Sequence, residues 1–181
     1  MAHVVVGLGN PGPEYRDTRH NVGQRVLDTL AGRFKKAFRR DGQLLVAHAV
    51  WRAEPLHLVK PLTFMNVSGP AVAAALRRLR AEAADLILVY DDIDLPLGVV
   101  RSRLRGSSGG HHGVESVINA LGTDQIRRVK IGIDRPEHKR HVPDHVLTTF
   151  EPQEEAAIAA AIDSAADRVL ALVRAKPGIA D

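Results

Sequence analysis

His20 lies in a polar segment and is a candidate for a catalytic base. It lies in the stretch YRDTRHNVG (residues 15–23), directly before apolar spacing that predicts a helix over Val22–Phe34. Thr18 and Asn21 are residue types that cap helices, so we expect His20 close to the helix N-terminus. The positive end of the helix dipole disfavours a charged imidazole and lowers its pKa. The position predicts a neutral general base, with a structural or merely exposed histidine as the alternative.

Three acids follow a predicted buried strand in the stretch YDDID, residues 90–94. Asp91, Asp92 and Asp94 have three possible uses: turn formation, a magnesium site, or a carboxylate that orients a histidine. A magnesium site needs an oxygen cage, and no further ligands in the sequence clearly complete one. We therefore favour the orienting role for this group.

A glycine-rich loop, GLGNPG at residues 7–12, matches the pattern G-x-G-x-x-G that is typical of dinucleotide-binding enzymes. Pro11, Pro13 and Asn10 instead favour an extended loop, because these residue types form turns and proline disfavours helix before it. The acid expected after the second strand is also missing, since Asp28 falls inside the first predicted helix. We reject the dinucleotide interpretation. The loop is predicted to present the Asn10 amide at the carboxyl end of a strand, where α/β proteins commonly bind ligands.

A second glycine-rich segment, GSSGG at residues 106–110, matches the G-x-S-x-G pattern of a nucleophile elbow between a strand and a helix. Under that hypothesis Ser108 is the nucleophile of a serine esterase. The glycines after Ser108 favour a looser loop, which suits contact with phosphate or ribose equally well. Both interpretations stay open at the level of sequence.

Basic residues are unevenly distributed along the chain, which carries 25 Lys and Arg against 21 Asp and Glu, a net charge of +4. Arg101, Arg103 and Arg105 alternate, so a strand places all three on one face. Such a row repels itself unless it is solvated or meets a polyanion, and we weigh phosphate binding and a solvated edge equally. Further clusters are Arg33, Lys35, Lys36, Arg39 and Arg40; Arg77, Arg78 and Arg80; and Arg127, Arg128 and Lys130.

The composition narrows the class of protein. The sequence has no cysteine, which excludes disulfides and thiolate metal sites and suits the cytoplasm. Its start, MAHVVVGLG, lacks the charged segment and long apolar run of a signal peptide. No apolar run approaches the roughly 18 residues that a membrane span needs. We expect a cytoplasmic protein without a membrane segment.

The elements that must position these residues alternate along the chain, which predicts a single α/β domain over residues 1–181, an α/β/α sandwich with a twisted mixed sheet. Residues 134–150 are irregular and are predicted to form a lid or a surface connection. A hairpin is expected between the predicted strands Leu44–Trp51 and Leu56–Lys60, with its turn around Glu54 and Pro55. The predicted strands are His3–Leu8, Leu44–Trp51, Leu56–Lys60, Leu86–Tyr90, Val99–Leu104 and Val129–Ile133, and the predicted helices are Val22–Phe34, Asn66–Arg80, His112–Leu121 and Pro152–Ala175.

Five segments, taken in order, resemble bacterial-type peptidyl-tRNA hydrolases. They are VVGLGNPGPEYRDTRHNVG, KPLTFMNVSG, VYDDIDLPLG, GSSGGHHG and RVKIGIDRP, and together they span nearly the whole chain. The resemblance implies a monomeric α/β sandwich that hydrolyses the ester of peptidyl-tRNA, bound by its acceptor stem and CCA end. It implies no metal, no organic cofactor and no obligate protein partner.

The resemblance also assigns roles by position. It implies that His20 activates water, that Asp91 orients His20, and that Asn10 recognises an N-blocked aminoacyl group over a free one. The positions implied to contact the substrate are Tyr15, Phe64 and Asn66 for the peptide and the terminal adenosine, and Arg103 and Lys130 for the 5′ phosphate of the tRNA.

Two features complicate the assignment. The family usually has Asn where this sequence has His112, and Ser107 and Ser108 stand in a loop that is usually richer in glycine. We count His112 among the substrate-binding positions, where a neutral imidazole can both donate and accept as Asn does, with loss of that role as the alternative. These departures keep open a non-catalytic tRNA-binding protein on the same fold. Asn66 has two interpretations of its own, a helix N-cap or an amide donor to the developing oxyanion.

Overall fold

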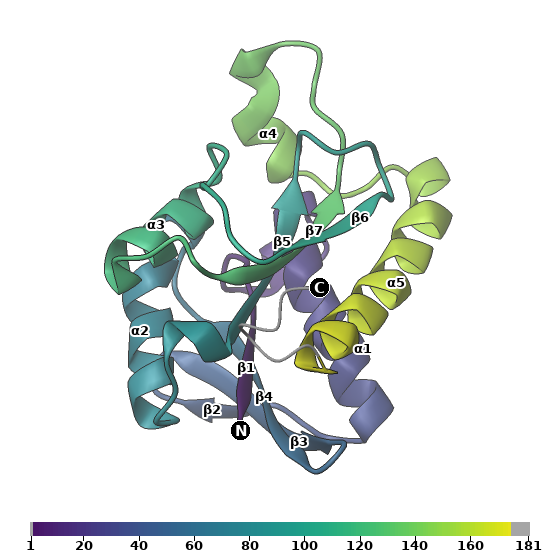
Figure 1. The fold of residues 1–181 in the computed structure, drawn as a ribbon. Helices are drawn as coiled ribbons and strands as arrows, with labels where there is room; N and C mark the ends of the chain where they lie inside the picture. The colour runs from purple at the N-terminus through teal and green to yellow at the C-terminus, as the bar shows by residue number, and fades with distance from the viewer. Residues whose placement is uncertain (1, 175–181) are drawn as a thin grey trace.

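The computed structural model describes residues 2–174 and shows a seven-stranded sheet with helices on both faces (Figure 1). The order of strands across the sheet is β2-β3-β4-β1-β5-β7-β6. The strands are β1 (His3–Gly7), β2 (Arg39–Asp41), β3 (Leu44–Trp51), β4 (Glu54–Pro61), β5 (Leu86–Asp92), β6 (Val100–Arg103) and β7 (Arg127–Gly132).

The centre of the sheet is parallel and its edges are antiparallel. β1 runs parallel to both β4 and β5, and β5 runs parallel to β7. The pairings β2–β3, β3–β4 and β6–β7 are antiparallel. Because parallel strands end at the same edge, the segments that follow β1, β4 and β5 emerge side by side, which brings together motifs far apart in the sequence.

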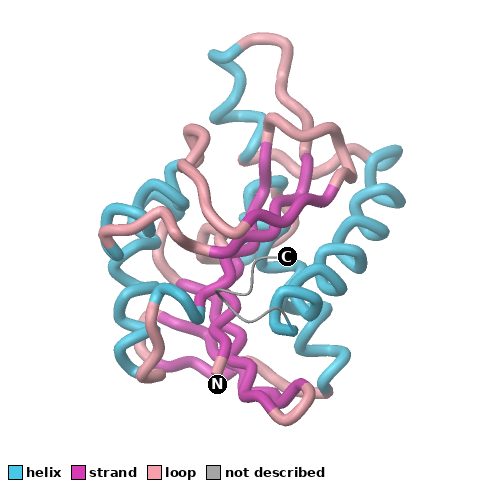
Figure 2. Tube along the Cα trace, viewed as in Figure 1, coloured by secondary structure: helices cyan, strands magenta, loops and turns pink. Residues whose placement is uncertain are grey.

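Two long helices cover each face of the sheet (Figure 2). α1 (Val22–Phe34) packs with α5 (Glu155–Arg174) on one face, and α2 (Ser68–Arg78) packs with α3 (His112–Leu121) on the other. Side chains alternate along the central strands, so Val5 and Ile87 join the first core while Val4 and Leu88 join the second. This arrangement confirms the predicted α/β sandwich with a mixed sheet.

The hairpin between β3 and β4 turns at Arg52 and Ala53, so its prediction around Glu54 and Pro55 was wrong. Arg52 and Ala53 have φ values of 50° and 66°, the left-handed conformation that a two-residue hairpin turn requires. Neither is a residue type that signals such a turn. Pro55 is tolerated within β4 because the pairing of β4 with β1 starts only at Leu56.

Several element boundaries also differ from the prediction. β6 ends at Arg103, so Arg105 does not continue a strand with Arg101 and Arg103. α2 begins at Ser68, after a 3-10 turn over Met65–Val67. The short strand β2 was not predicted, because its three residues are all charged and exposed.

Residues 134–150 form a projection beyond the sheet that contains the short helix α4 (Val142–Val146) (Figure 1). Its return to the body of the protein is held by Arg19, whose guanidinium donates to the His145 carbonyl oxygen at 3.2 Å and to the Thr148 hydroxyl. The last predicted helix was expected to reach Ala175, which lies outside the described residues. No helix within residues 2–174 is long and apolar enough to cross a membrane.

Candidate active site

His20 and Asp91 lie side by side because the first turn of α1 rests on β5. Asp91 is near the carboxyl end of β5, and His20 lies in the 3-10 turn over Arg19–Asn21 that leads into α1. Gly23 permits the approach, since a Cβ atom there would lie only 2.2 Å from the carbonyl oxygen of Val89. The glycine therefore brings the histidine within reach of the carboxylate.

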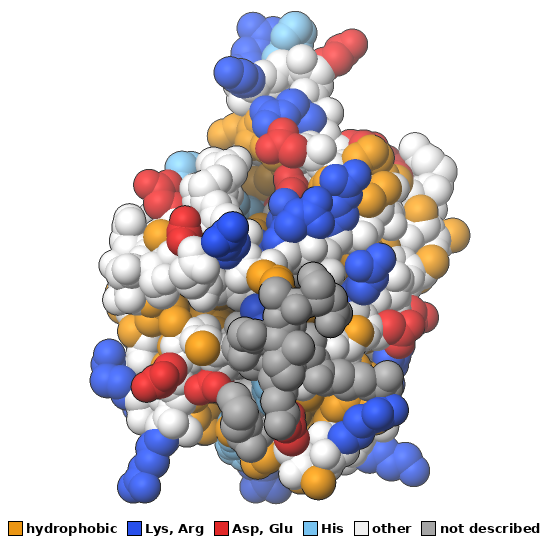
Figure 3. All heavy atoms as spheres, viewed as in Figure 1, with side chains coloured by type: hydrophobic (Ala, Val, Ile, Leu, Met, Phe, Trp, Pro, Cys, Tyr) orange, Lys and Arg blue, Asp and Glu red, His pale blue; other side chains and the backbone are white. Residues whose placement is uncertain are grey.

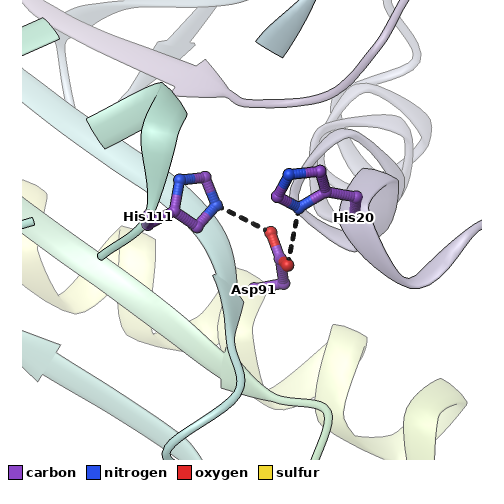
Figure 4. Close-up of side chains that lie close together, drawn as sticks. All are labelled: His20, Asp91 and His111. Carbon is purple, nitrogen blue, oxygen red and sulfur yellow. Dashed lines mark hydrogen bonds and ion pairs between the residues drawn. The ribbon is translucent and has the colours of Figure 1, made fainter. Parts of the chain in front are cut away.

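The Asp91 carboxylate accepts hydrogen bonds from two histidines (Figure 4). Oδ2 accepts from His20 Nδ1 at 2.7 Å, and Oδ1 accepts from His111 Nε2 at 2.9 Å. Asp91 is 2% exposed, whereas the side chain of His20 is 13% exposed. Because Nδ1 of His20 carries the proton that Asp91 accepts, the lone pair of the neutral imidazole is on Nε2. That nitrogen has no hydrogen-bond partner within residues 2–174.

The electrostatics of the pair favour a charged carboxylate and a basic imidazole. Burial lowers the pKa of His20, but the charge of Asp91 and the hydrogen bond to it leave that pKa above its ordinary value of 6.5. Burial also opposes the Asp91 charge, yet the two histidines hold the pKa of its carboxyl well below its usual range. The expectation that the helix N-terminus lowers the His20 pKa was therefore wrong, because the adjacent carboxylate dominates.

His111 is a site residue that sequence reasoning missed. It caps the N-terminus of α3, and its Nδ1 accepts from the backbone N–H of Val114 at 3.3 Å. Nε2 of His111 therefore bears the proton that Asp91 accepts. The signal in the sequence was the position of His111 between the glycine-rich loop and a predicted helix, directly before the departure at His112.

A single pocket of about 720 Å³ contains this group and all of the predicted site residues. Part of its wall comes from the α4 segment, through Val142, Val146 and Leu147. Lys and Arg side chains gather below that segment, over β6 (Figure 3). The predicted residues that line the pocket are Asn10, Tyr15, His20, Phe64, Asn66, Asp91, Arg103, His112 and Lys130.

Asn10 is held rigidly in the loop after β1. Its backbone N–H donates to Asn21 Oδ1 and its carbonyl oxygen accepts from Asn21 Nδ2, both at 2.9 Å. Its side-chain Oδ1 accepts from the Met65 backbone N–H at 2.7 Å, which leaves Nδ2 as the group that Asn10 offers to the pocket. Both polar atoms of the Asn21 side chain therefore bind the backbone of Asn10. The prediction that Asn21 or Thr18 caps the helix through its side chain was wrong.

The segment after β4 adds an aromatic and an amide to the pocket. Phe64 is 57% exposed and meets Tyr15 edge to face, with ring centroids 6.4 Å apart. Asn66 is exposed in the 3-10 turn before α2. The alternative that Asn66 is the helix N-cap is wrong, because the residue at that position is Val67 and no side chain caps the helix. Asn66 is therefore available to a ligand.

The predicted phosphate-binding residues have different surroundings. Arg103 is exposed, whereas Lys130 lies 3.2 Å from Asp92 and is partly buried. Arg127 and Arg128, which the sequence analysis counted with Lys130 as one basic cluster, are 5% and 2% exposed. Both arginines are buried, but Arg128 contributes to the pocket wall, whereas Arg127 does not. The other basic residues of the pocket are Arg103, Arg105 and Lys130.

The serine-esterase hypothesis finds no support in the geometry. Ser108 lies within the loop 104–111, between the end of β6 and the start of α3, and not at a sharp strand-to-helix junction. Its hydroxyl accepts from the Gly110 backbone N–H at 3.3 Å. No described histidine or acid forms a hydrogen bond with that hydroxyl. Ser108 therefore lacks the base that would activate it.

The three acids Asp91, Asp92 and Asp94, at and just beyond the end of β5, do not converge on a magnesium site. Asp91 binds the two histidines, Asp92 pairs with Lys130, and Asp94 pairs with Arg135. The described chain does contain one group whose ligand atoms lie within 4.8 Å of one another, formed by Asp91 with His20 and His111. The hydrogen bonds through the carboxylate account for that proximity.

A histidine held by a buried carboxylate, in an open pocket of an α/β domain, is an arrangement that can supply a base to a water molecule. Comparison with known proteins gives the family. A family model described as Peptidyl-tRNA hydrolase matches residues 4–179. The chain belongs to the peptidyl-tRNA hydrolase family, as the resemblance of its motifs indicated.

Individual relatives agree with this assignment. Peptidyl-tRNA hydrolases of Brevibacillus brevis and Aquifex aeolicus are 44% and 45% identical, over 91% and 96% of this chain and 87% and 91% of theirs. The crystal structure of peptidyl-tRNA hydrolase from Acinetobacter baumannii superposes with a TM-score of 0.90 at 31% identity, covering 96% of this chain and 89% of that one. An Arabidopsis thaliana 5′-methylthioadenosine nucleosidase shares the fold alone, with a TM-score of 0.58 at 11% identity and 95% of each chain covered.

Proposed function

We propose that this protein hydrolyses the ester bond of peptidyl-tRNA, with His20 as the general base and Asp91 as the residue that orients it. The observation that carries the proposal is the 2.7 Å hydrogen bond from His20 Nδ1 to Asp91, in a pocket that the base itself lines. This bond fixes the tautomer that places a lone pair on Nε2. Family membership supports the substrate class.

The reaction needs only water and a base, because an ester is an activated acyl group. Water gives one proton to His20 Nε2 while its oxygen bonds to the ester carbonyl carbon. The tetrahedral intermediate then expels the ribose oxygen, which takes that proton back from the imidazolium. The products are a tRNA with a free hydroxyl and the peptide acid, which releases its proton to solvent and leaves as the carboxylate. General base catalysis of this kind contributes about 10²–10⁴-fold, and Asp91 stabilises the transient imidazolium.

Asn10 is suited to distinguish a peptide from a free amino acid. Its Oδ1 is engaged by the Met65 backbone, so Nδ2 is the donor presented to the substrate. A donor can bind the carbonyl oxygen of an N-blocked aminoacyl group, whereas a free α-ammonium group has no acceptor. Asn10 therefore favours peptidyl-tRNA over aminoacyl-tRNA.

Asn66 is the second amide of the pocket, and we assign it to the developing oxyanion. It is exposed and not used as a helix cap, which leaves its donor free of a structural role. A donor of this kind contributes about 2.7–4 kcal/mol to transition-state stabilisation. Asn66→Ala should lower turnover with little change in binding; weaker binding with intact turnover would contradict the assignment.

The remaining lining residues fit the two ends of the substrate. Tyr15 and Phe64 offer an aromatic surface to the peptide and the terminal adenosine, and Arg103 and Lys130 offer cations to the 5′ phosphate. Lys130 would share its charge between that phosphate and Asp92. Residues 134–150 would act as a lid over the peptide, since Val142 and Val146 form part of the same wall.

The test compares an N-acetyl-aminoacyl-tRNA with the same tRNA carrying the unblocked amino acid. We expect release from the blocked substrate only, and a loss of about 100-fold or more in His20→Ala. His48→Ala is the matched control, since His48 is an exposed histidine on β3 that does not line the pocket. Tight tRNA binding without release would indicate a binding protein, and release that survives His20→Ala would refute the mechanism.

A further inference from the structure

A buried arginine in the wall of the pocket, Arg128, has no role in the proposed mechanism. Arg128 is 2% exposed, and its guanidinium forms no ion pair with any carboxylate in the described part of the chain. All of its hydrogen bonds go to neutral acceptors. Burying a cation without a counter-charge opposes folding, so a guanidinium in this position calls for an explanation beyond stability.

The contacts of Arg128 join three segments around the pocket. Its Nε donates to the Ile126 carbonyl oxygen and its Nη2 to that of Asp124, both at 3.1 Å. Its Nη1 donates to the Ser107 carbonyl oxygen at 3.0 Å and to the Tyr90 hydroxyl at 3.3 Å. The planar guanidinium thus ties the residues around the start of β7 to the loop 104–111 and to β5.

Both the loop and Tyr90 lead to the same catalytic contact. The loop ends at His111, which donates to Asp91 at 2.9 Å. The ring of Tyr90 packs against the ring of His111 at 63°, with centroids 5.0 Å apart. Tyr90 also directly precedes Asp91 on β5. Arg128 therefore fixes both sides of the hydrogen bond that orients the carboxylate behind His20.

We propose that Arg128 is a positioning residue for the reaction: its guanidinium holds the loop 104–111 and Tyr90 so that His111 donates to Asp91. The proposal rests on the proposed function for its effect on turnover, but not for its structural consequence. Loss of the guanidinium lets His111 leave Asp91, and the carboxylate then orients His20 less well. Arg128 contacts no substrate in this role.

The chain offers a matched control one residue away. Arg127 is also buried, at 5% exposure, but strand side chains alternate and it points to the other face of the sheet. Its Nη1 donates to the Leu172 carbonyl oxygen at 3.0 Å, and its Nη2 donates to His3 Nδ1 at 3.2 Å. Arg127→Gln removes a buried guanidinium from β7 without touching the pocket.

The experiment compares Arg128→Gln, Arg128→Lys and Arg127→Gln in full-length protein. Proton NMR of ¹⁵N-histidine-labelled protein should show a hydrogen-bonded Nε2 proton of His111 in the wild type and in Arg127→Gln, and its loss in both Arg128 variants. Lysine keeps the charge but cannot span four acceptors. We expect kcat on N-acetyl-aminoacyl-tRNA to fall about 10–100-fold in the Arg128 variants with KM nearly unchanged. Arg127→Gln should keep kcat within about twofold.

Tyr90→Phe tests the same contact if the Arg128 variants do not fold, because it removes only the hydroxyl that Arg128 contacts. We expect a weakened His111 signal and a several-fold lower kcat. An unchanged His111 signal in the Arg128 variants and in Tyr90→Phe would overturn the proposal, as would a kcat loss that Arg127→Gln reproduces. The NMR signal does not depend on turnover. A wild type that shows the signal but hydrolyses nothing would therefore refute the proposed function and not this contact.

Discussion

Two histidine–carboxylate pairs of equal length lie at opposite ends of the central strands. His20 Nδ1 lies 2.7 Å from Asp91 at the carboxyl end, and His3 Nε2 lies 2.7 Å from Glu54 at the amino end. The pairs differ at the second ring nitrogen. His3 Nδ1 accepts from Arg127 at 3.2 Å, whereas His20 Nε2 meets no hydrogen-bond partner within residues 2–174.

Hydrogen-bond length therefore does not distinguish the proposed catalytic pair from the pair formed by His3 and Glu54. His3 is 2% exposed and lines no described pocket, so both of its nitrogens serve the fold. His20 uses Nδ1 for the bond to Asp91, and its Nε2 has no hydrogen-bond partner among the described residues, as the proposed base requires. The parallel strands place this second kind of pair where their carboxyl ends open into loops, which is the usual position of ligand sites in α/β proteins.

The largest expected effect is on kcat, and it should distinguish the carboxylate of Asp91 from that of Glu54. Asp91→Asn replaces an acceptor by an amide, which directs an N–H toward one of the two histidines. If His20 Nδ1 must accept, its proton moves to Nε2 and the base is lost, at a cost on the order of 10³–10⁴ in kcat. Glu54→Gln should change kcat less than twofold. Single-turnover release from N-acetyl-aminoacyl-tRNA measures both, and a loss below tenfold in Asp91→Asn would contradict the mechanism.

The pH dependence should follow the His20 pair alone. A base must be neutral, so kcat should rise with pH and level off above the pKa of His20, which Asp91 raises above 6.5. Below that pKa the rate should fall about tenfold per pH unit, after subtraction of spontaneous ester hydrolysis. The raised pKa of His20 also stabilises the folded state. This contribution is fully present below pH 6.5 and is lost as the pH rises through the raised pKa. His3→Asn should leave the rate profile unchanged, while a flat wild-type profile between pH 5 and 8 would exclude a histidine base.

The sequence was sufficient to predict the fold class and most of the pocket, because both depend on local patterns. Buried strands are followed by loops rich in Gly, Asn and Asp, and parallel topology brings those loops together. The predictions that were wrong concern properties that depend on tertiary contacts. The sign of the His20 pKa shift is set by Asp91, 71 residues away. The burial of Arg127 and Arg128 follows from the position of β7 inside the sheet, which charge counting does not reveal.

A smaller effect is expected when His20 and Asp91 are moved apart and neither residue is replaced. Gly23→Ala places a Cβ atom 2.2 Å from the Val89 carbonyl oxygen, so the start of α1 must withdraw from β5. We expect a kcat loss of about tenfold and a stability loss of about 1–3 kcal/mol. Gly32→Ala is the control in the same helix, because a Cβ atom there meets nothing within 4 Å. Equal behaviour of the two variants in kinetics and urea denaturation would show that the close approach is unimportant.

Disruption of the other pair should affect stability alone. His3→Leu leaves Glu54 without its partner and Arg127 with one fewer acceptor, which costs about 1–3 kcal/mol of unfolding free energy. Activity at 25 °C should stay within twofold. His48→Leu, an exposed change on β3, should alter stability by no more than about 0.5 kcal/mol. A large loss of activity in His3→Leu at unchanged stability would mean that the two ends of the sheet are coupled.

The smallest effect is expected at His112, where the family usually has Asn. The side chain of His112 is 78% exposed, lies 3.9 Å from Glu115 and forms no hydrogen bond with Asp91, whereas the adjacent His111 is held by that carboxylate. His112→Asn should therefore change kcat and KM by less than about threefold, and His111→Ala should lower kcat at least tenfold. Steady-state kinetics at a fixed pH compares the two. A loss above tenfold in His112→Asn would show that the exposed imidazole of His112 reaches the substrate. His20 would then not be the only histidine of the pocket with a ring nitrogen available to the substrate.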